Sequence, residues 1–417
     1  MAIVRPFKAI RPAADLADKV AALPYDVMNS QEAREMTVGN PHSFLHVDKA
    51  EIDLDPAIDL YDKRVYEKAR DNLNQMIADG VFLQEEKPCL YIYRQEMDGR
   101  EQIGIVACAS IDEYRDNTIR KHELTRADKE QDRINHVDYC DANTGPIFLT
   151  YRANMYISFR VAEYMERKEP IYDFTSEDGI GHTVWVIDEG DVIREIIGRF
   201  ESVENLYIAD GHHRCASAAR VGMMRREQNP QWDGDEEFNY FLSVIFPDNH
   251  LYIMDYNRIV KDLNGNTAEE FMAKVSEKFD ITPYAGEGAL KPAKKHTFGM
   301  YLEGKWYELA AKEGSFDAAD PVAQLDVSIM QDNLLHPILG IGDPRTDKRI
   351  DFVGGIRGLQ HLANRVDSGE MKVAFSMFPT TMDDLMDIAD AGAIMPPKST
   401  WFEPKLRSGL FIHKLSE

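Results

Sequence analysis

The feature that most constrains the fold of this chain is a strand-like apolar run that ends in a glycine turn. A helix of small residues follows the turn at once. The run Leu206-Tyr-Ile208 has the character of a buried strand, and Gly211 permits the sharp turn that follows. The next stretch, Cys215-Ala-Ser-Ala-Ala-Arg220, belongs to a helix predicted over 214–228. Its small side chains allow close packing on a sheet, so the segment predicts a layered protein of helices and strands.

The same turn carries groups that suit an anion. Backbone amides at the start of a helix favour negative charge, and Gly211 lets a ligand approach them closely. His212, His213 and Arg214 add side-chain donors, and the planar guanidinium can grip a phosphate with two hydrogen bonds. Asp210 stands beside them, where it can accept a proton or hold a metal-bound water. The alternative is that these side chains only cap the helix, but their combination with the glycine turn favours a binding site.

The length of the chain indicates the number of its domains, and its charge limits the classes of molecule that it can bind. Its 417 residues exceed what one hydrophobic core normally supports, and we expect two domains, residues 1–255 and 256–417. The 72 acidic and 48 basic residues give a formal net charge of −24, and no run of clustered Lys and Arg forms a basic patch. Such a chain repels a nucleic-acid backbone, so we expect no nucleic-acid partner. The sequence leaves a homo-oligomer open.

The chain shows no signal for export or membrane insertion. Its first ten residues include Arg5 and Lys8, and no apolar core follows them, which argues against a signal peptide. No stretch is long and apolar enough to cross a bilayer. The cysteines form no CxxC pair, which fits a reducing compartment and argues against a structural zinc site. They are Cys89, Cys108, Cys140 and Cys215. The sequence therefore predicts a cytoplasmic protein without membrane spans.

Strands and helices follow one another irregularly along the rest of the chain, which predicts an α+β fold with a mixed sheet. The step Asp98-Gly99 between two apolar runs predicts a hairpin, and Ser30 is expected to cap a first helix. Further strands are predicted at 89–95, 102–110, 146–151, 183–187, 240–246, 297–302, 305–310 and 373–377. Further helices are predicted at 61–80, 120–141, 267–279 and 327–335.

Two polar segments before the turn are candidates for the same site. Lys121-His122-Glu123-Leu-Thr125 lies in the charged stretch predicted to be helical, where His122 and Glu123 could face a ligand. A solvated helix face explains these charges equally well. In Pro24-Tyr-Asp26-Val27, Asp26 either shapes a rigid turn or supplies a carboxylate to a substrate hydroxyl. The residues alone do not decide between Asp26 and Glu123 as a base.

A third candidate lies near the C-terminus, where residues 394–405 combine prolines, lysines, hydroxyls and aromatic rings. A rigid loop of this kind can present Lys398, Ser399 and Thr400 to a phosphate. The alternative is a strand that closes the sheet and leaves Lys398 exposed. If the loop is part of the site, the last segment of the chain must fold back onto the first domain.

Several of these segments together resemble one known family. They are Arg5-Pro-Phe7, Pro24-Tyr-Asp-Val27, Lys121-His-Glu-Leu-Thr125, Ala209-Asp-Gly-His-His-Arg214 and Met395-Pro-Pro-Lys-Ser-Thr400. They span nearly the whole chain and look like the family of domain of unknown function 1015. The turn also resembles the phosphate-binding motif of the ParB/sulfiredoxin superfamily, which includes free serine kinases. The resemblance implies a ParB/sulfiredoxin-like core with a large C-terminal extension.

The resemblance to free serine kinases implies phosphoryl transfer to a small hydroxylated metabolite, with free L-serine as the first acceptor and O-phosphoserine as the product. It also implies Mg²⁺ and a donor that is ATP, ADP or pyrophosphate, with metal ligands left unassigned. The residues implied to bind phosphate are Gly211, His212, His213, Arg214, Lys121, His122, Lys398, Ser399 and Thr400. The implied catalytic carboxylates are Asp26, Glu123 and Asp210. The sequence has no P-loop and no kinase glycine-rich loop, so transfer would have to use this turn.

Two other functions share such a turn. A ParB-like nucleotide-binding regulator or nucleic-acid-associated protein would use it without small-molecule chemistry, but the acidic charge and the lack of a helix-turn-helix signal argue against it. A sulfur-redox enzyme like sulfiredoxin has a cysteine within the turn. Here a histidine occupies that place and Cys215 follows the arginine. Phosphoryl transfer is therefore the expected activity.

Overall fold

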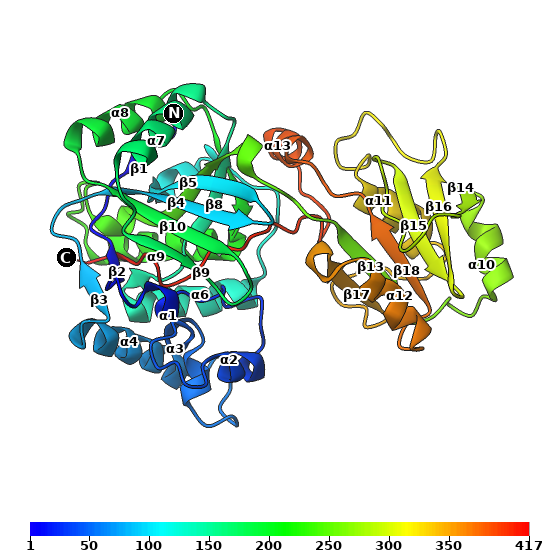
Figure 1. Ribbon diagram of the computed structural model, residues 1–417, viewed down its shortest axis with the longest axis horizontal. Helices are drawn as coiled ribbons and strands as arrows, with labels where there is room; N and C mark the ends of the chain where they lie inside the picture. The colour runs from blue at the N-terminus through cyan, green and yellow to red at the C-terminus, as the bar shows by residue number, and fades with distance from the viewer. Residues whose placement is uncertain (417) are drawn as a thin grey trace. The chain divides into compact units, whose positions relative to one another are not determined.

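The computed structural model describes residues 1–416, which form two compact units (Figure 1). The first unit contains Met1–Leu251 and the segment from Pro404 onward, and the second contains Tyr252–Glu403. The chain thus enters the second unit slightly before the domain boundary expected at residue 255, and its last segment returns to the first unit. Both units combine helices with sheets, which confirms the predicted α+β class.

The first unit is built on a nine-stranded mixed sheet. Its strand order is β6-β11-β8-β12-β5-β4-β10-β9, with β1 paired to β5. The pairs β11–β6 and β12–β8 are parallel, and the other pairs are antiparallel. The strands are β1 (Val4–Arg5), β4 (Leu90–Met97), β5 (Arg100–Ser110), β6 (Ile119–Arg120), β8 (Ile147–Tyr151), β9 (Tyr172–Thr175), β10 (Gly181–Ile187), β11 (Leu206–Asp210) and β12 (Tyr240–Pro247).

Local sequence signals account for several of these elements. Asp98 and Gly99 join β4 to β5 with φ angles of 54° and 75°, the left-handed pair that the predicted hairpin turn requires. The first long helix, α2 (Ser30–Met36), begins as expected. However, its cap is Asn29, which accepts hydrogen bonds from the backbone N–H groups of Gln31 and Glu32. The prediction that Ser30 caps this helix was therefore wrong by one residue.

The stretch 120–141, predicted as one helix, is divided in the structure. Strand β6 ends at Arg120, residues 121–126 are irregular, and α6 (Ala127–Cys140) follows. The strand forms because β11 offers a parallel neighbour, a contact between residues far apart in sequence. The segment Lys121–Thr125 therefore lies in a loop beside the sheet and not on a helix face.

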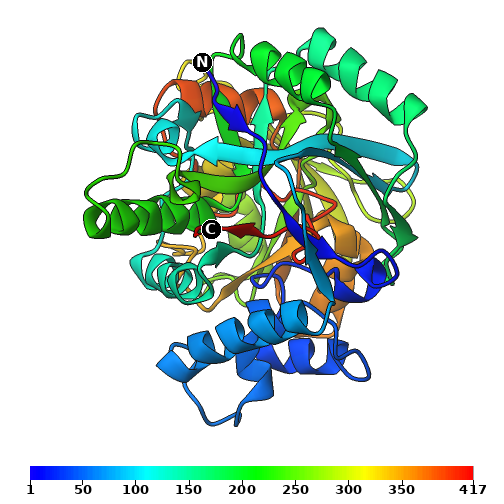
Figure 2. The same cartoon turned by 90° about the vertical axis from the view of Figure 1, so that its left-hand side faces the viewer.

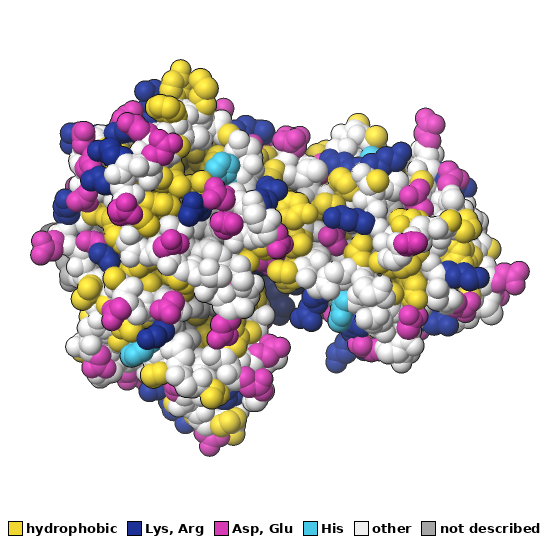
Figure 3. Space-filling view, in the orientation of Figure 1, with side chains coloured by type: hydrophobic (Ala, Val, Ile, Leu, Met, Phe, Trp, Pro, Cys, Tyr) yellow, Lys and Arg dark blue, Asp and Glu magenta, His cyan; other side chains and the backbone are white. Residues whose placement is uncertain are grey.

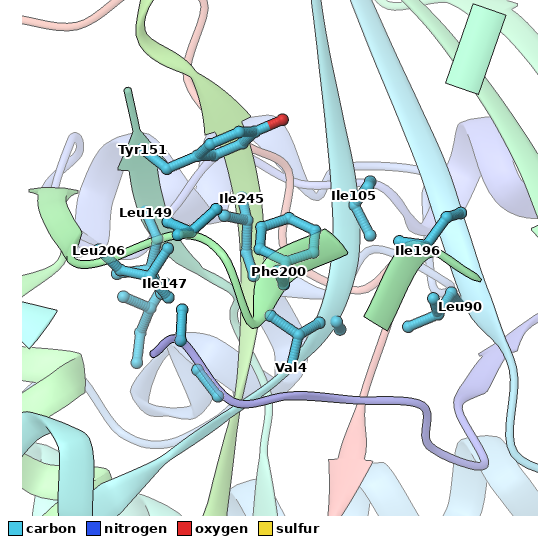
Figure 4. Close-up of a cluster of buried hydrophobic side chains, with 14 of the residues drawn as sticks. Val4, Leu90, Ile105, Ile147, Leu149, Tyr151, Ile196, Phe200, Leu206 and Ile245 are labelled. Carbon is cyan, nitrogen blue, oxygen red and sulfur yellow. The ribbon is translucent and has the colours of Figure 1, made fainter. Parts of the chain in front are cut away.

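Helices cover both faces of this sheet. Figures 1 and 2 show α7 (Met155–Arg167) and α8 (Gly190–Phe200) on one side, and α6 with α9 (His212–Gln228) on the other. The buried core on the sheet includes Val4, Leu149, Phe200 and Ile245 (Figure 4). On α9 the small residues packed into this core are Cys215, Ala218 and Ala219. Within residues 1–416 no helix combines the length and apolar character needed to cross a membrane.

The N-terminal region adds a smaller helical core below this sheet (Figure 2). Its main helices are α3 (Leu45–Asp48) and α4 (Lys63–Ala78), and α4 packs against α6. Buried residues of this core include Phe44, Leu73 and Phe82. A short strand pair, β2 (Ile10–Pro12) with β3 (Phe82–Gln84), closes it. The region thereby places the end of α3 beside the buried face of α6.

The second unit contains a six-stranded antiparallel sheet in the order β14-β16-β15-β18-β13-β17. The predicted hairpin at 297–310 is confirmed, with Glu303 and Gly304 in its turn. The predicted helix at 327–335 begins as α11 (Asp326–Met330) and continues as a π-helical turn, Gln331–Leu335. The strands are β13 (Tyr256–Val260), β14 (Phe279–Pro283), β15 (Thr297–Leu302), β16 (Lys305–Ala311), β17 (Ile350–Gly354) and β18 (Val373–Met377). The helices are α10 (Ala268–Val275), α11 (Asp326–Met330), α12 (Gln360–Asp367) and α13 (Met382–Asp390).

The segment after Pro404 packs within the first unit and forms hydrogen bonds with several of its elements. Gln95 Nε2 donates a hydrogen bond to the carbonyl of Lys405, and Gln102 Nε2 donates one to the carbonyl of Pro404. Farther along, Ile412 bridges to Ile10, and β19 (His413–Lys414) pairs with β7 (Ala142–Asn143). These contacts hold the backbone of Lys405 at the sheet that ends in the glycine turn.

Candidate functional site

The glycine turn has the geometry of a backbone anion site. Strand β11 ends at Asp210, Gly211 has φ +94°, and α9 begins at His212. A Cβ atom built on Gly211 would lie 3.2 Å from Arg214 Nε and 3.4 Å from Cζ, so the guanidinium rests directly over the glycine. Both the left-handed backbone and this close approach require glycine. The turn therefore brings helix amides and a cation to one place.

Asp210 is held by the returning C-terminal segment. Lys405 Nζ lies 2.9 Å from Asp210 Oδ2, and the backbone N–H of Gly211 donates to Oδ1 at 2.8 Å. Burial raises the pKa of Asp210, but the charges of Lys405 and Arg214 outweigh it, so this pKa lies well below its usual range. Lys405 was not among the predicted site residues, although the segment 394–405 had been singled out. Asp210 is thus an ionised carboxylate between two cations.

Two histidines meet behind the turn. The rings of His122 and His212 pack edge to face with centroids 4.5 Å apart, and both side chains are buried. Burial lowers the pKa of His122 to about 4, and burial together with the neighbouring His122 places the pKa of His212 well below 6.5. Within the described chain, His122 Nδ1 and His212 Nε2 are buried without a hydrogen-bond partner. Both rings are neutral at pH 7, so they can offer hydrogen bonds but no positive charge.

Arg214 and His213 face different surroundings. Arg214 Nη1 donates to the carbonyl of Pro146 at 2.6 Å, whereas its buried Nε has no hydrogen-bond partner among residues 1–416. His213 Nε2 accepts a hydrogen bond from the backbone N–H of Arg126 at 3.0 Å. Burial lowers the pKa of His213, although the charge of Asp26 opposes this. Arg214 is therefore the fixed positive charge of the turn.

Both candidate bases lie near these groups. Glu123 Oε2 is 3.6 Å from His212 Nδ1, and the Glu123 side chain is 50% exposed. Asp26 is exposed, and its charge acts on both His213 and Tyr25. Lys121 Nζ lies 3.9 Å from the centre of the Tyr114 ring, and the charge of Lys121 contributes to the low pKa of His212. The structure thus gathers the predicted residues of the first unit around one turn.

The sequence matches one family model over most of its length. The model is described as "Protein of unknown function (DUF1015)" and matches residues 4–328. The chain belongs to this family. The match includes the turn and every candidate residue placed around it except Lys405. No curated protein matches the sequence.

Solved structures similar to this DUF1015 protein include the following three, which have low sequence identity to it. A conserved hypothetical protein from Pyrococcus furiosus is 14% identical with a TM-score of 0.36, and covers 74% of this chain and 94% of its own. A free serine kinase in complex with AMP is 13% identical with a TM-score of 0.36, covering 74% and 91%. SbnI from Staphylococcus aureus, with a C-terminal truncation, is 10% identical with a TM-score of 0.38, covering 74% and 86%.

The C-terminal residues predicted to bind phosphate lie in the second unit of this DUF1015 protein. Lys398 is exposed with φ +61°, and its carbonyl accepts a hydrogen bond from Arg258 Nη2 at 2.9 Å. Ser399 is buried, and its Oγ donates to the carbonyl of Pro396 at 2.6 Å. Thr400 is half-buried. A role for Lys398, Ser399 and Thr400 in phosphate binding stays a prediction.

A buried ion pair close to Arg214 could not be predicted from the sequence. Thr144 Oγ1 donates to Asp48 Oδ1 at 2.8 Å, and His136 Nε2 lies 3.6 Å from the same oxygen. Burial lowers the pKa of His136, but Cys140 and Asp48 raise it to about 9. A cavity of about 20 Å³ is lined by Asp48, His136 and Arg214. The pair therefore joins α3 and α6 beneath the guanidinium.

The residues that the structure describes contain no preformed metal centre. Within residues 1–416, no three His, Cys, Asp or Glu side chains are grouped as metal ligands. Asp210 offers one carboxylate, and Mg²⁺ in phosphate sites commonly uses one or two carboxylates together with substrate phosphates and water. On the face of the first unit shown in Figure 3, acidic side chains are interspersed with basic ones. No continuous basic patch stands out on that face.

Proposed function

We propose that this DUF1015 protein transfers a phosphoryl group to the hydroxyl of a small metabolite, with free L-serine as the first acceptor to test. The observation that carries the proposal is the Gly211 turn, where a helix N-terminus, the Arg214 guanidinium and the Asp210–Lys405 pair meet. Arg214 Nε is buried without a partner among the described residues, and a phosphate oxygen would supply one. Serine is preferred because the turn sequence resembles that of free serine kinases.

The chemistry of phosphoryl transfer fits these groups. Such catalysis consists mainly of positioning and charge neutralisation, and it needs cations on the donor phosphates and a carboxylate at the acceptor hydroxyl. The helix amides, Arg214 and Lys405 would bind the donor, and the neutral His212 would add a hydrogen bond. Asp210 would hold Mg²⁺ together with the phosphates, which requires its contact with Lys405 to loosen when the donor binds.

The acceptor base is Asp26 or Glu123 in this proposal. Glu123 is the closer to the histidine pair, since its carboxylate lies 3.6 Å from His212. The charge of Asp26 acts on His213, where it opposes the lowering of the pKa by burial. Asp26→Asn and Glu123→Gln keep the shape of each side chain. The base is the residue whose replacement lowers kcat by about 10²-fold or more while donor binding stays intact.

The proposal is tested by incubating the full-length protein with Mg²⁺, free L-serine and, separately, ATP, ADP or pyrophosphate, and measuring O-phosphoserine by mass spectrometry. Arg214→Ala should abolish the product. Arg220→Ala is the matched control, because Arg220 lies on the same helix but is exposed and away from the turn. Donor binding at the turn without product from serine or other small alcohols would instead favour a nucleotide-binding regulator, and DNA association that weakens steeply with added salt would support that alternative.

A further inference from the structure

The first unit holds a second cavity that the proposed function does not use. It lies between α7 and the sheet and has a volume of about 560 Å³, within the range of about 300–1,000 Å³ typical of small-molecule sites. Tyr151 and Pro247, the last residues of β8 and β12, form one end of it. The glycine turn follows β11, which runs antiparallel to β8. The cavity therefore lies at the end of β8 (Tyr151), and the turn lies beside the start of β8 (Phe148).

The lining of this cavity is mainly apolar. Side chains of the sheet and of α7 supply most of it, including Ile105, Val161, Trp185 and Ile245. The apolar surface continues outside the cavity along α7. Phe159 is 71% exposed there, on the helix face that also carries Ala162 and Glu166. The cavity thus offers space for an apolar body and an apolar lip at its mouth.

The charged side chains that line the cavity leave one carboxylate uncompensated. Arg94 is fully engaged, because Nη1 lies 3.1 Å from Glu101 Oε1, Nη2 donates to Thr183 Oγ1 at 3.1 Å, and the guanidinium covers the Trp185 ring. His250 Nδ1 accepts a hydrogen bond from the backbone of Ile103, and burial lowers the pKa of His250, so its ring is neutral at pH 7.

One arginine and two glutamates give the lining a net charge of −1, and the excess charge belongs to the exposed Glu166 at the mouth. The whole chain carries a formal charge of −24, which adds to the repulsion of anions. A cationic group is therefore favoured over an anionic one here, which is the reverse of the preference at the glycine turn.

We propose that this cavity binds a small amine with an aromatic or branched aliphatic body, which fills the apolar space while its ammonium group lies at Glu166. The site is independent of the phosphate chemistry at the turn. Its occupant is a positively charged small molecule because the lining has apolar walls, a neutral histidine and one unpaired carboxylate.

Three probes that share a phenyl body and differ in their polar end test the proposal on the full-length protein. They are 2-phenylethylamine, 2-phenylethanol and 3-phenylpropionate, and their binding is measured by calorimetry and by the tryptophan fluorescence of the protein, to which Trp185 in the cavity wall contributes. The amine is expected to bind most tightly and the carboxylate least. Ala162→Phe, which fills the cavity from an exposed helix position, should remove binding of all three. Glu166→Gln should weaken only the amine, by about two- to fivefold, as for an exposed charge pair.

Glu169→Gln is the matched control, because it removes the same charge just beyond α7 and outside the cavity lining. It should leave all three affinities unchanged. Binding of the carboxylate as tightly as the amine would overturn the proposal. So would unchanged amine binding in Ala162→Phe with a native melting temperature. Self-association of the native protein that Phe159→Ser abolishes would show that a second copy covers the cavity, which also overturns it.

Discussion

Replacing Gly211 by alanine separates the backbone strain of the turn from its contact with Arg214. A left-handed backbone costs an L-residue about 1–2 kcal/mol, so Gly211→Ala should lower the free energy of unfolding by about that amount. Gly80 is the matched control, because its φ of +76° imposes the same strain while its Cβ would meet no atom within 4 Å. Gly80→Ala should therefore cost the same stability and nothing more.

The new Cβ on Gly211 has a second effect, because it would lie 3.2 Å from Arg214 Nε. The guanidinium must shift by a few tenths of an ångström, although Pro146 holds Nη1 on its other side. A hydrogen bond to a charged group contributes about 1.5–3 kcal/mol, so losing the alignment of Arg214 should weaken phosphate-donor binding about ten- to hundredfold. Gly80→Ala should bind donors as the native protein does.

The assay combines thermal unfolding with calorimetric titration of ATP, ADP and pyrophosphate in the presence of Mg²⁺. The prediction for Gly211 is refuted if Gly211→Ala and Gly80→Ala bind every donor equally well, because the turn would then not be the phosphate site. It is also refuted if both variants lose binding equally, since the loss would then follow from reduced stability alone.

Four further predictions concern packing and protonation. Gly222→Ala should lower the free energy of unfolding by about 1–3 kcal/mol, because its Cβ would lie 2.4 Å from the Phe238 carbonyl. Gly198→Ala meets nothing within 4 Å and should raise that free energy by up to about 1 kcal/mol, as chemical denaturation can show. NMR titration should show the His122 ring neutral down to about pH 4. The raised pKa of His136 should make stability full below about pH 6.5, its unfolded pKa, and progressively lost as pH rises to about 9, by up to about 3 kcal/mol.

Each of these predictions has a clear contrary result. Equal effects of the two glycine replacements would mean that α9 does not pack closely on its neighbours. Titration of His122 near pH 6.5 would mean that the histidine pair is open to solvent. If the pH dependence of stability between 6.5 and 9 persists in His136→Gln, it does not arise from the pair with Asp48.

The sequence predicted the elements whose signals are local. The β4–β5 hairpin depends on the Asp98-Gly99 step, and the strand, turn and helix around Gly211 are contiguous, so both could be recognised without knowledge of the tertiary structure. The division of residues 120–141 could not. Charge density does not distinguish a loop from a helix, and Ile119–Arg120 becomes a strand only because β11 lies beside it.

The candidate site shows the same limit. Residues Asp210–Arg214 were predicted because they are adjacent in sequence. The partner of Asp210 is Lys405, 195 positions away, and nothing local marks that contact. The only signal was the presence of two lysines in 394–405, of which Lys398 and not Lys405 was predicted to bind phosphate. The pair of Asp48 and His136 was missed because neither residue stands in a distinctive pattern.

The most direct test of the central claim is a crystal structure of the full-length protein with Mg²⁺ and ADP. We expect a phosphate group at the first turn of α9, within hydrogen-bond distance of Arg214 Nε and close to Lys405. Nucleotide phosphates bound elsewhere on the chain, with the Asp210–Lys405 pair and Arg214 unchanged, would contradict it.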